Sequence, residues 1–541
     1  MAKGLYKIKK NKKPNMLANL LIFSMFRRSD KNPADIIHKA YSIYYWRNSR
    51  TLKSRCKVVL AFLVSPFKIS KDIFKWLRKV NTRVTTLHKC RIRQALEQFY
   101  LAYFFSINSE NYYLQGFYQK DGLKRARRFV NKGALKNGVF KLLTTYGQYT
   151  NSGTEIWSLG NKVEFSHFCI QNDIPTVPVI MEFVAGGTVK YYTQDYSTLP
   201  EEDIFCKPNV DNEGKGAEVW FWEKGCFKSP KGKKLDKNQL QDRLKNLANK
   251  HICGSILVQP LILPHPELAA FRKNATPTIR VLSYVKENGD IEIDQAMLRF
   301  SIDSNSIVDN ASAGGMVAPI EVASGKLSSA FYTNYKNIGK SVDDLNGTLI
   351  SNKTIPHWNE VKELVARAHN LFRYRLIIGW DILITEDQPL VLEGNSQPGI
   401  CFIQKAHKTS FGEMSIGTAV ANYCQEAIKT LYNGKLEING VQEKITHPLF
   451  KTRKTLTLKI YGKVQGVGYR KWLFKRAKEL NINGWVQNTP DNAVRGVING
   501  KGKALEDIVK LAKIGPKNAK VDSIEVSTSL DSVNKSFKIL R

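Results

Sequence analysis

The sequence predicts an α+β protein built from successive parts, and three patterns support this prediction. Residues 31–150 place apolar side chains three and four positions apart, as amphipathic helices do. Residues 155–440 alternate short β-rich apolar segments with longer helical segments. Residues 455–541 follow the order βαββαβ, which is the ferredoxin-like split motif. A chain of 541 residues also exceeds the size that one hydrophobic core usually supports.

Changes in composition along the chain predict the boundaries of these parts. We assign residues 1–115 to a basic helical N-terminal region, 116–435 to an α+β domain, 436–454 to a polar linker and 455–541 to the βαββαβ domain. The helical segments of the first region fit either a cap packed on the next domain or helices that lie on a membrane surface. The cap is the preferred interpretation.

Positive charge is concentrated at the two ends of the chain. The net charge is +36, and residues 1–100 carry 24 basic and 4 acidic side chains, whereas residues 451–541 carry 20 and 7. Basic ends attract phosphate-bearing surfaces such as anionic lipid or nucleic acid, unless they are only a solvated Lys-rich surface. Peripheral contact with an anionic membrane through the N-terminal helices is the partner interaction that this charge leaves open. Nucleic acid is not an expected partner, although the sequence leaves that alternative and the oligomeric state open.

The cysteines and apolar runs bear on location. The 8 cysteines are dispersed without a CxxC pair, which is typical of reduced, buried thiols in a cytoplasmic protein. The 9 histidines are scattered and do not predict a zinc site. Apolar runs at 17–26 and 58–64 are too short to cross a bilayer, and no cleavage-site pattern follows them. We therefore expect a cytoplasmic protein, with any membrane contact on the inner face.

Two segments of the middle region suit a nucleotide. Lys207 lies on the apolar strand at 203–209, and the glycine loop at 213–217 that follows could fold over phosphates while the ammonium group binds one. Alone this pattern is weak, because a lysine that enters a turn is far more often a surface residue. In the strand at 255–263, Pro260 has no N–H to give to a sheet. A base edge could accept from the N–H of Leu261 or Ile262 and donate to the carbonyl of Gln259 or Pro260.

Residues 377–399 predict a β-hairpin with acidic residues in apolar surroundings. Asp381 lies on the first strand, and Glu393 and Asn395 lie two apart on the second, so that they share a face. These three hard oxygen ligands suit Mg²⁺ that bridges nucleotide phosphates. Burial of two unpaired carboxylates is costly, and a cation would offset that cost.

This order of elements resembles the ATP-grasp fold over roughly residues 110–430, and most closely its sugar-transfer-associated (hexapeptide-transferase and glutathione-synthase-like) branch. Residues 116–435 would then be an ATP-grasp domain that uses ATP and Mg²⁺. Two positions depart from the family pattern: Asn161 stands where an Asp more often precedes the phosphate-binding lysine, and Gln259 stands where a Glu often begins the segment that binds adenine. The resemblance implies phosphate-binding Lys162 and Lys207, the flexible loop with Gly214, Lys215 and Gly216, an adenine hinge at Gln259, Pro260, Leu261 and Ile262, the ribose ligand Glu267, the catalytic arginine Arg280, and the magnesium ligands Asp381, Glu393 and Asn395.

Residues 462–470, GKVQGVGYR, carry a glycine loop that ends at an arginine. Consecutive backbone N–H groups of 465–470 can converge there on one phosphate, and the start of a helix adds partial positive charge. With Asn488 one strand later, the segment 455–541 resembles acylphosphatase. The resemblance implies that Arg470 stabilises the transition state and that Asn488 orients the attacking water. The loop residues are Gln465, Gly466, Val467, Gly468 and Tyr469.

The two resemblances together predict an enzyme that makes and also hydrolyses acyl phosphates. ATP-grasp enzymes typically phosphorylate a carboxylate, and an amine or thiol then attacks the acyl phosphate. We therefore expect a ligase that forms a carbon–nitrogen bond in polysaccharide biosynthesis, acting on small-molecule or glycan-linked carboxylate and amine substrates. The alternatives are a phosphohydrolase that processes acyl phosphates without net ligation, and a non-catalytic protein that binds anionic surfaces. The sequence names neither the carboxylate nor the amine.

Overall fold

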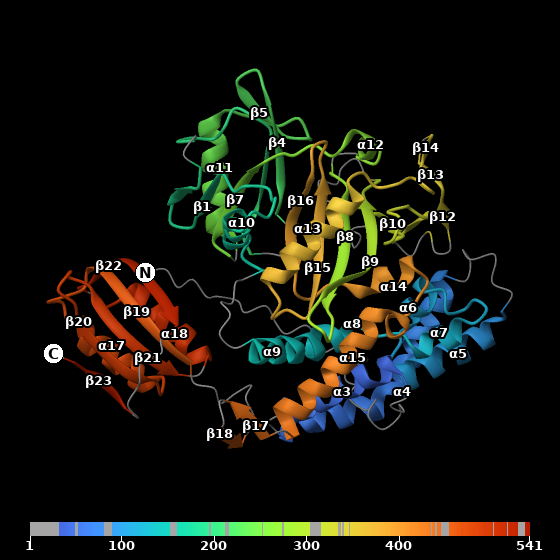
Figure 1. Cartoon of the computed structure of the whole chain (residues 1–541), viewed down its shortest axis with the longest axis horizontal. Coiled ribbons are helices and arrows are strands. Elements are labelled where there is room, and N and C mark those ends of the chain that lie inside the picture. The colour runs from blue at the N-terminus through green and yellow to red at the C-terminus, as the bar shows by residue number, and fades with distance from the viewer. Residues whose placement is uncertain are drawn as a thin grey trace. The chain divides into compact units, whose positions relative to one another are not determined.

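The structure of the chain is a computed structural model that divides into two compact units, Met1–Ala427 and Ile428–Arg541 (Figure 1). The four domain boundaries expected from the sequence stay predictions. The residues that the structure describes are 32–48, 52–80, 89–151, 159–193, 196–210, 216–251, 253–272, 275–302, 315–333, 337, 340–345, 347–433, 435–438, 441–444, 454–500, 502–516, 518–528 and 536–540.

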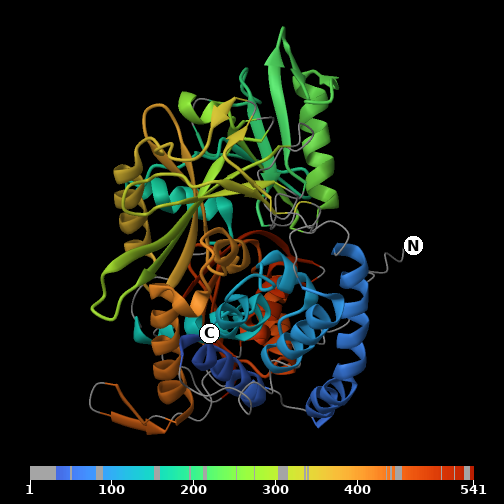
Figure 2. The ribbon, with the colours of Figure 1, turned by 90° about the vertical axis from the view of Figure 1, so that its right-hand side faces the viewer.

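Helices make up the first part of the larger unit, as the periodicity predicts. They pack on the residues that follow, since Gln115 Nε2 donates to the carbonyl of Cys401 at 2.9 Å and Arg128 pairs with Glu413 at 3.1 Å. The helices thus form a cap, which is the preferred of the two interpretations (Figure 2). They are α3 (Pro33–Asn48), α4 (Leu52–Val80), α5 (Arg91–Phe105), α6 (Ser109–Leu114), α7 (Gly122–Arg127), α8 (Lys132–Ala134), the π-helix η2 (Leu135–Val139) and α9 (Phe140–Thr150).

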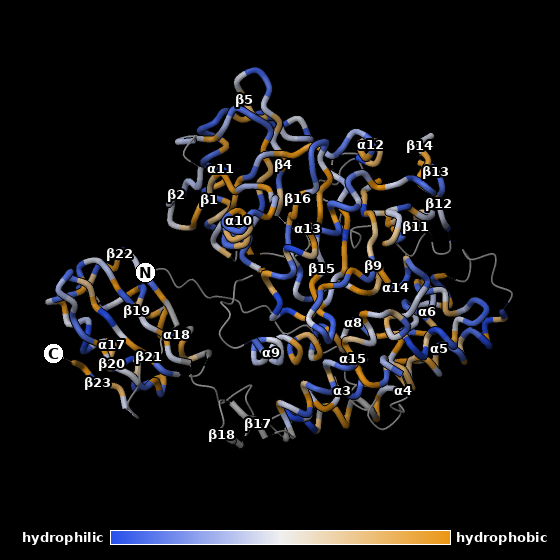
Figure 3. The backbone as a smooth tube through the Cα atoms, in the orientation of Figure 1, coloured by the Kyte–Doolittle hydropathy of each residue, from blue (hydrophilic) through white to orange (hydrophobic). Residues whose placement is uncertain are grey.

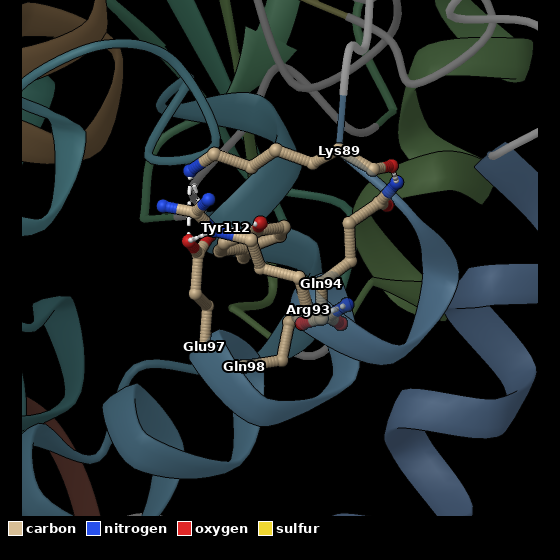
Figure 4. Close-up of polar contacts among 6 residues, drawn as sticks. All are labelled: Lys89, Arg93, Gln94, Glu97, Gln98 and Tyr112. Atoms are coloured by element: carbon tan, nitrogen blue, oxygen red, sulfur yellow. Dashed lines mark hydrogen bonds and ion pairs between the residues drawn. The ribbon is translucent and has the colours of Figure 1, made fainter.

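A buried carboxylate ties the helices of the cap together. Glu97 on α5 is 8% exposed and pairs with Lys89 at 2.8 Å and Arg93 at 3.3 Å (Figure 4). The hydroxyl of Tyr112 on α6 donates to the same carboxylate at 2.7 Å. Two cations and a hydroxyl group satisfy this charge, so that its burial is tolerated and joins α5 to α6.

The first sheet of the larger unit has seven strands in the order β2-β1-β7-β3-β4-β5-β6. Helix α11 (Lys237–Lys250) covers it and begins at a capping box between Asp236 and Gln239. Leu240 and Leu244, four positions apart, enter the core beneath the helix. The strands are β1 (Met181–Val184), β2 (Val189–Tyr191), β3 (Ile204–Pro208), β4 (Glu218–Glu223), β5 (Cys226–Lys228), β6 (Lys234–Leu235) and β7 (Ser255–Pro260), and α10 (Lys162–Gln171) precedes them.

The second sheet has the order β12-β11-β10-β9-β8-β15-β16, and α13 (Trp358–Leu371) packs on one face. Ile279, Val281 and Trp380 enter the core on that face. The alternate residues, including Arg280 and Asp381, point to the other face. The strands are β8 (Thr278–Val285), β9 (Ile291–Phe300), β10 (Met316–Ile320), β11 (Ala330–Tyr332), β12 (Ser341–Val342), β15 (Ile377–Ile384) and β16 (Pro389–Asn395).

A buried polar network supports β15 on the face of the sheet that α13 covers. The indole of Trp380 donates to Ser283 Oγ at 2.8 Å, and that hydroxyl lies 2.7 Å from Nδ1 of His369. Burial lowers the pKa of His369 to about 4, so the imidazole is neutral at physiological pH. The remaining elements of this unit are α12 (Pro266–Ala269), the β13–β14 hairpin (Asp344–Leu345 and Thr348–Leu349), α14 (Ile400–Ala406), the 3₁₀ turn η5 (Phe411–Glu413) and α15 (Ser415–Ile428), which extends to the boundary with the second unit.

The second unit confirms the predicted βαββαβ order and has the strand order β22-β19-β21-β20-β23. Its last strand was not predicted, and it pairs parallel with β20. A short hairpin of β17 (Lys435–Ile438) and β18 (Val441–Lys444) follows the π-helix η6 (Lys429–Asn433), within the segment expected to be a linker. The other elements are β19 (Lys454–Lys463), α17 (Tyr469–Glu479), β20 (Asn483–Asn488), β21 (Val494–Gly500), α18 (Gly502–Ile514), β22 (Lys520–Thr528) and β23 (Phe537–Ile539).

All eight cysteines are free, but the expectation that they are buried is confirmed for Cys169, Cys206 and Cys424 alone; Cys226, Cys253 and Cys401 are half-buried. Cys56 lies on the outward side of α4, and Cys90 is the residue before the first turn of α5, so both are exposed. Within the described ranges, the helices include none that is both long enough and apolar enough to span a bilayer.

Gly484 should be essential for the stability of the second unit. Its φ of +142° is open to glycine alone, and a Cβ there would collide with the carbonyl oxygen of Val497 on the paired strand. We expect Gly484→Ala to lower the free energy of unfolding by about 3 kcal/mol or more. Gly468→Ala, where φ is +78° with open space around the site, should cost only about 1 kcal/mol. Urea unfolding and hydrogen exchange of β20 and β21 measure both, and equal losses would contradict the steric argument.

Candidate active sites

The predicted acidic hairpin brings its residues into register with an arginine. Asp381 on β15 lies directly opposite Glu393 on β16 and, on its other side, opposite Arg280 on β8. Residues directly opposite in antiparallel strands share a face of the sheet. The register shifts between Asp381 and Ile382, where β16 contributes one extra residue, and such bulges commonly re-aim side chains beside active sites.

Two arginines hold Asp381. Arg280 donates Nε to Oδ1 at 2.5 Å and Nη2 to Oδ2 at 3.0 Å, a two-bond fork. Arg299 on β9 lies 3.2 Å from Oδ2 and is itself oriented by Thr278, to whose hydroxyl it donates at 2.6 Å and 3.2 Å. The sequence analysis missed Arg299, although its parity on the strand at 294–302 places it on the same face once β9 pairs with β8.

The charges around the two carboxylates drive their pKa values apart. Burial alone would raise the pKa of Asp381, but the guanidinium groups of Arg280 and Arg299 lower it to about 2. Burial and the adjacent Asp381 charge raise the pKa of Glu393, against the attraction of Lys207. Asp381 therefore stays ionised, while Glu393 holds a proton more readily than a surface carboxyl does. A divalent cation beside both would relieve that repulsion.

The residues of the hairpin fit a hard metal ion. Asn395 lies opposite Gly379, so that its amide group falls on the same face as Asp381, and its Nδ2 donates to Glu393 Oε1 at 3.2 Å. Two carboxylates and one amide oxygen are ligands that Mg²⁺ accepts. Within the described part of the chain, no three His, Cys, Asp or Glu side chains lie close enough together to hold a metal ion. The third ligand beside Asp381 and Glu393 would therefore be the amide oxygen of Asn395.

Both predicted phosphate lysines approach this hairpin. Burial lowers the pKa of Lys207 on β3 to about 8, against the opposing charge of Glu393 and with the like charge of Lys162 also acting on it. Lys162, the first residue of α10, donates Nζ to the carbonyl of Asn209 at 3.1 Å. The two lysines and the carboxylates of the other sheet thus share one electrostatic neighbourhood.

Asn209 and Glu182 support these lysines, and the sequence analysis missed both. Asn209 Oδ1 accepts from the backbone N–H of Lys162 at 2.9 Å, and its Nδ2 donates to Glu182 Oε1 at 3.1 Å. Glu182 also accepts from the hydroxyls of Tyr192 and Ser255. Asn161, which departs from the usual Asp, accepts from two N–H groups of the first turn of α10 and caps that helix as Asp would.

The predicted base and ribose contacts stay predictions. Gln259 Nε2 donates to the carbonyl of Val177 at 2.8 Å, which fixes the strand before the hinge. The N–H of Leu261 donates to the carbonyl of Asp203 at 2.8 Å and is therefore already engaged. Of the two N–H groups expected to bind a base, that of Ile262 is the remaining candidate. Pro260 ends β7. Glu267, expected at the ribose, is exposed and pairs with Lys353 at 3.4 Å. Gly214 and Lys215 lie outside the described residues, and Gly216 has a φ of +77°.

The glycine loop of the second unit leads directly into a helix. Gly466 and Gly468 have φ values of +73° and +78°, and a Cβ at either position would meet open space, so the backbone conformation alone requires glycine there. Gly468 precedes the first turn of α17, whose leading N–H groups have no partner within the helix. Gln465 Nε2 donates to the carbonyls of Thr489 and Ala493 at 2.9 Å and 2.7 Å, and the hydroxyl of the buried Tyr469 donates to the carbonyl of Ala512. Val467 packs against the core of this unit.

Arg470 lies at the start of α17 and Asn488 at the end of β20, and the loop between β19 and α17 is hydrogen bonded to the residues that follow β20. Arg470, in the first turn of α17, donates Nη1 to the carbonyl of Leu540 at 3.1 Å. Asn488 ends β20, one residue before the Thr489 that binds Gln465, and its Oδ1 is buried without a hydrogen-bond partner. A buried acceptor that lacks a partner is costly unless a water or ligand satisfies it. Asn492 has a φ of +61°, the turn conformation that asparagine tolerates.

This fold is that of an ATP-binding ligase domain joined to a small phosphohydrolase domain. The family described as sugar-transfer associated ATP-grasp matches residues 141–416, just over half of the chain, and the chain belongs to that family. The family described as acylphosphatase matches residues 456–539. Both resemblances expected from the sequence are confirmed, and both domains indicate an enzyme.

Individual relatives agree with the second match. The acylphosphatase of Thiobacillus denitrificans is 42% identical over 74 residues, which cover 14% of this chain and 83% of that protein. The acylphosphatase of Thermococcus kodakarensis is 39% identical over 83 residues, 15% of this chain and 91% of that protein.

The structure of D-alanyl-alanine synthetase A from Vibrio cholerae aligns with 49% of this chain and 65% of its own at 17% identity. The TM-score is 0.27, a likeness too slight to bear on function.

Nucleotide affinity should depend on the protonation of Lys207. Its ammonium group is charged below pH 8 and loses its proton above that value, since burial lowers its pKa to about 8. We expect the affinity for a fluorescent ATP analogue to fall by up to about tenfold per pH unit above this value. Lys207→Arg keeps its charge over the whole range and should give a flat profile. A flat profile in the parent protein would contradict the role of Lys207.

Hydrolysis of benzoyl phosphate should depend on Arg470. Arg470→Ala removes the fork of donors expected at the phosphoryl oxygens, and we expect kcat to fall by about 10² to 10³. The matched control is Arg476→Ala, on the same helix, where the side chain makes only a surface ion pair with Glu479 at 2.6 Å. Steady-state kinetics of the full chain measure both variants. If hydrolysis survives Arg470→Ala, the assignment of this site is wrong.

Proposed function

We propose that the chain is an ATP-dependent ligase that joins a carboxylate to an amine or thiol through an acyl phosphate, and that its C-terminal domain hydrolyses acyl phosphates. The family match supports an ATP-grasp ligase and a substrate related to sugars or cell-surface polymers. The observation that carries the proposal is Asp381, held in register between Arg280 and Glu393, with Lys207 in the same electrostatic neighbourhood. A pair of adjacent carboxylates flanked by cations suits a metal-bound nucleotide phosphate and its transfer.

The residues of this site would account for phosphoryl transfer. A substrate carboxylate oxygen would attack the γ-phosphorus of ATP, the bond to the bridging oxygen would break and ADP would leave. Arg280, Lys162 and Lys207 would bind the phosphates and offset the charge that develops during transfer. Asp381 and Glu393, with the amide of Asn395, would hold Mg²⁺, which supplies further positive charge to the phosphates.

The second step uses the acyl phosphate as a reactive mixed anhydride. The amine nitrogen or thiol sulfur would attack the acyl carbon, the carbon–oxygen bond to phosphate would break, and the attacking group would lose its proton to solvent. The products are then an amide or thioester, ADP and inorganic phosphate. The ligase step therefore needs water to be excluded from the acyl phosphate until the acceptor arrives.

The C-terminal domain would break the same kind of bond. The loop N–H groups and Arg470 would bind the phosphoryl group, and the unpaired Oδ1 of Asn488 would orient a water toward the phosphorus. Attack by that water releases the carboxylate and inorganic phosphate, so no covalent intermediate is required. We infer that this domain removes acyl phosphate that escapes or that forms on a wrong carboxylate. A tethered module that only binds phosphorylated ligands is the alternative.

ADP release in the presence of candidate carboxylates tests the ligase site. Glu393→Gln keeps the shape of the side chain but removes the charge of a proposed metal ligand, and we expect ADP release to fall by at least about 10²-fold. Glu386→Gln is the matched control, because Glu386 is exposed at the turn of the same hairpin. Sugar acids and amino acids serve as the carboxylate panel. Unchanged turnover in Glu393→Gln would contradict the proposed site.

The products formed in Arg470→Ala distinguish ligation from net hydrolysis. If the chain is a ligase, mass spectrometry should detect a covalent amide or thioester at least as abundant as in the parent protein. If only free carboxylate and phosphate form in both proteins, the phosphohydrolase alternative replaces the ligase. If neither protein turns over ATP with any carboxylate, a non-catalytic binding protein becomes the better interpretation.

A further inference from the structure

Helix α4 of the cap is apolar on two opposite faces. One face carries Ile69, Ile73 and Trp76, which are 3 to 6% exposed and pack into the cores of the cap. A helix that served only as part of the cap would be polar on its other face. The orange stretches along α4 in Figure 3 mark apolar residues that are separated by hydrophilic ones, and a second set of them points away from the core.

This second set forms one exposed stripe. Leu60, Leu63, Phe67 and Phe74 are 61%, 68%, 75% and 61% exposed, and their spacings of three, four and seven residues place them on the same side of the helix. From Leu60 to Phe74 the stripe runs about 21 Å along the helix axis. Contiguous exposed apolar surface of this kind marks a binding face more often than chance exposure does.

Basic side chains border the stripe. Lys68, Lys71 and Lys75 are exposed on the same helix, and the guanidinium of Arg78 lies 4.8 Å from the centre of the Phe74 ring. This arrangement puts cationic ends around an apolar centre. It is the pattern of helices that lie in the interface of a bilayer, with the apolar side chains among the acyl chains and the lysines at the headgroups.

The acidic groups of α4 and α5 do not weaken this positive face. The described acids on these two helices are Asp72 and Glu97. Asp72 accepts from the backbone N–H of Ser109 at 3.3 Å, and Glu97 is buried among the cations described above. A nucleic acid would use the lysines but offers no apolar layer for Phe67. A protein partner would favour the stripe, whereas lysines are depleted in protein interfaces. An anionic bilayer matches both features.

We propose that α4 lies on an anionic membrane surface, with Leu60, Leu63, Phe67 and Phe74 inserted and the lysines bound to phosphate headgroups. The helix is parallel to the surface rather than across it. The cap therefore has two functions, one face packing on the rest of the unit and the other holding the enzyme at a bilayer. Membrane contact follows from the charge and exposure of α4 and does not depend on the proposed ligase reaction.

Co-sedimentation of the full chain with lipid vesicles tests the proposal. Phosphatidylcholine vesicles with phosphatidylglycerol should bind the parent protein, and vesicles of phosphatidylcholine alone should bind it far less. Leu63→Ser/Phe67→Ser should weaken binding at least about tenfold. Leu263→Ser/Leu349→Ser, which removes two leucines that are both 59% exposed elsewhere in the unit, should leave binding unchanged. Circular dichroism and the midpoint of thermal unfolding confirm that each variant is folded.

A charge-matched pair of variants distinguishes membrane binding through α4 from binding that depends only on the net charge of the chain. Lys68→Glu/Lys71→Glu/Lys75→Glu should weaken binding about a hundredfold or more, since each lysine near an anionic surface contributes severalfold. Lys231→Glu/Lys233→Glu/Lys234→Glu reverses the same number of charges on exposed lysines near β6 and should have little effect. Equal losses in the two triple variants would overturn the proposal, because overall charge would then explain the binding.

Other occupants of the stripe would give different results. If sedimentation velocity shows a dimer that Leu63→Ser/Phe67→Ser dissociates, and that variant still binds vesicles as the parent does, the stripe joins two copies of the chain and the proposal is wrong. If vesicles bind only a variant that lacks residues 1–31, the stripe is covered by the chain's own N-terminal segment and the proposal is also wrong.

Discussion

The ion pairs of Asp381 with Arg280 and Arg299 are the interaction on which the larger unit depends. They join β15, β8 and β9, three adjacent strands of the second sheet, across one face. The opposite face of the same strands is the hydrophobic core beneath α13. Loss of either partner would leave a buried charge unpaired on strands whose register the core fixes. The stability of the sheet and the electrostatics of the site are therefore set by the same three side chains.

Local patterns were sufficient to predict most of the fold. The helical period of the cap, the βαββαβ order and the hairpin with Asp381, Glu393 and Asn395 all follow from spacing within short segments. Contacts between segments were missed, because they need strand register that one sequence does not supply. Arg299 meets Asp381 only because β9 and β15 both pair with β8. The strand β23 was missed because three residues near a chain end give too short a pattern to recognise.

The supporting polar residues illustrate the same limit at the predicted nucleotide site. Lys162 and Lys207 could be predicted from the motifs around them, whereas Glu182 and Asn209 act through contacts with those motifs and have no motif of their own. In the cap, sequence analysis predicts the abundance of lysine but not its placement. The acids of α4 and α5 are engaged with partners, while many of the lysines stay exposed beside apolar side chains. The formal charge of a segment thus understates how positive its outer surface is.

The lowered pKa of Lys207 has a consequence for the chemical durability of the enzyme. At neutral pH an amine of this kind is uncharged more often than a surface lysine is, and an uncharged amine is a nucleophile. A reactive acyl donor held beside it would acylate the enzyme itself and so inactivate it. Under the proposed ligase reaction, hydrolysis of unused acyl phosphate by the C-terminal domain would limit this self-acylation.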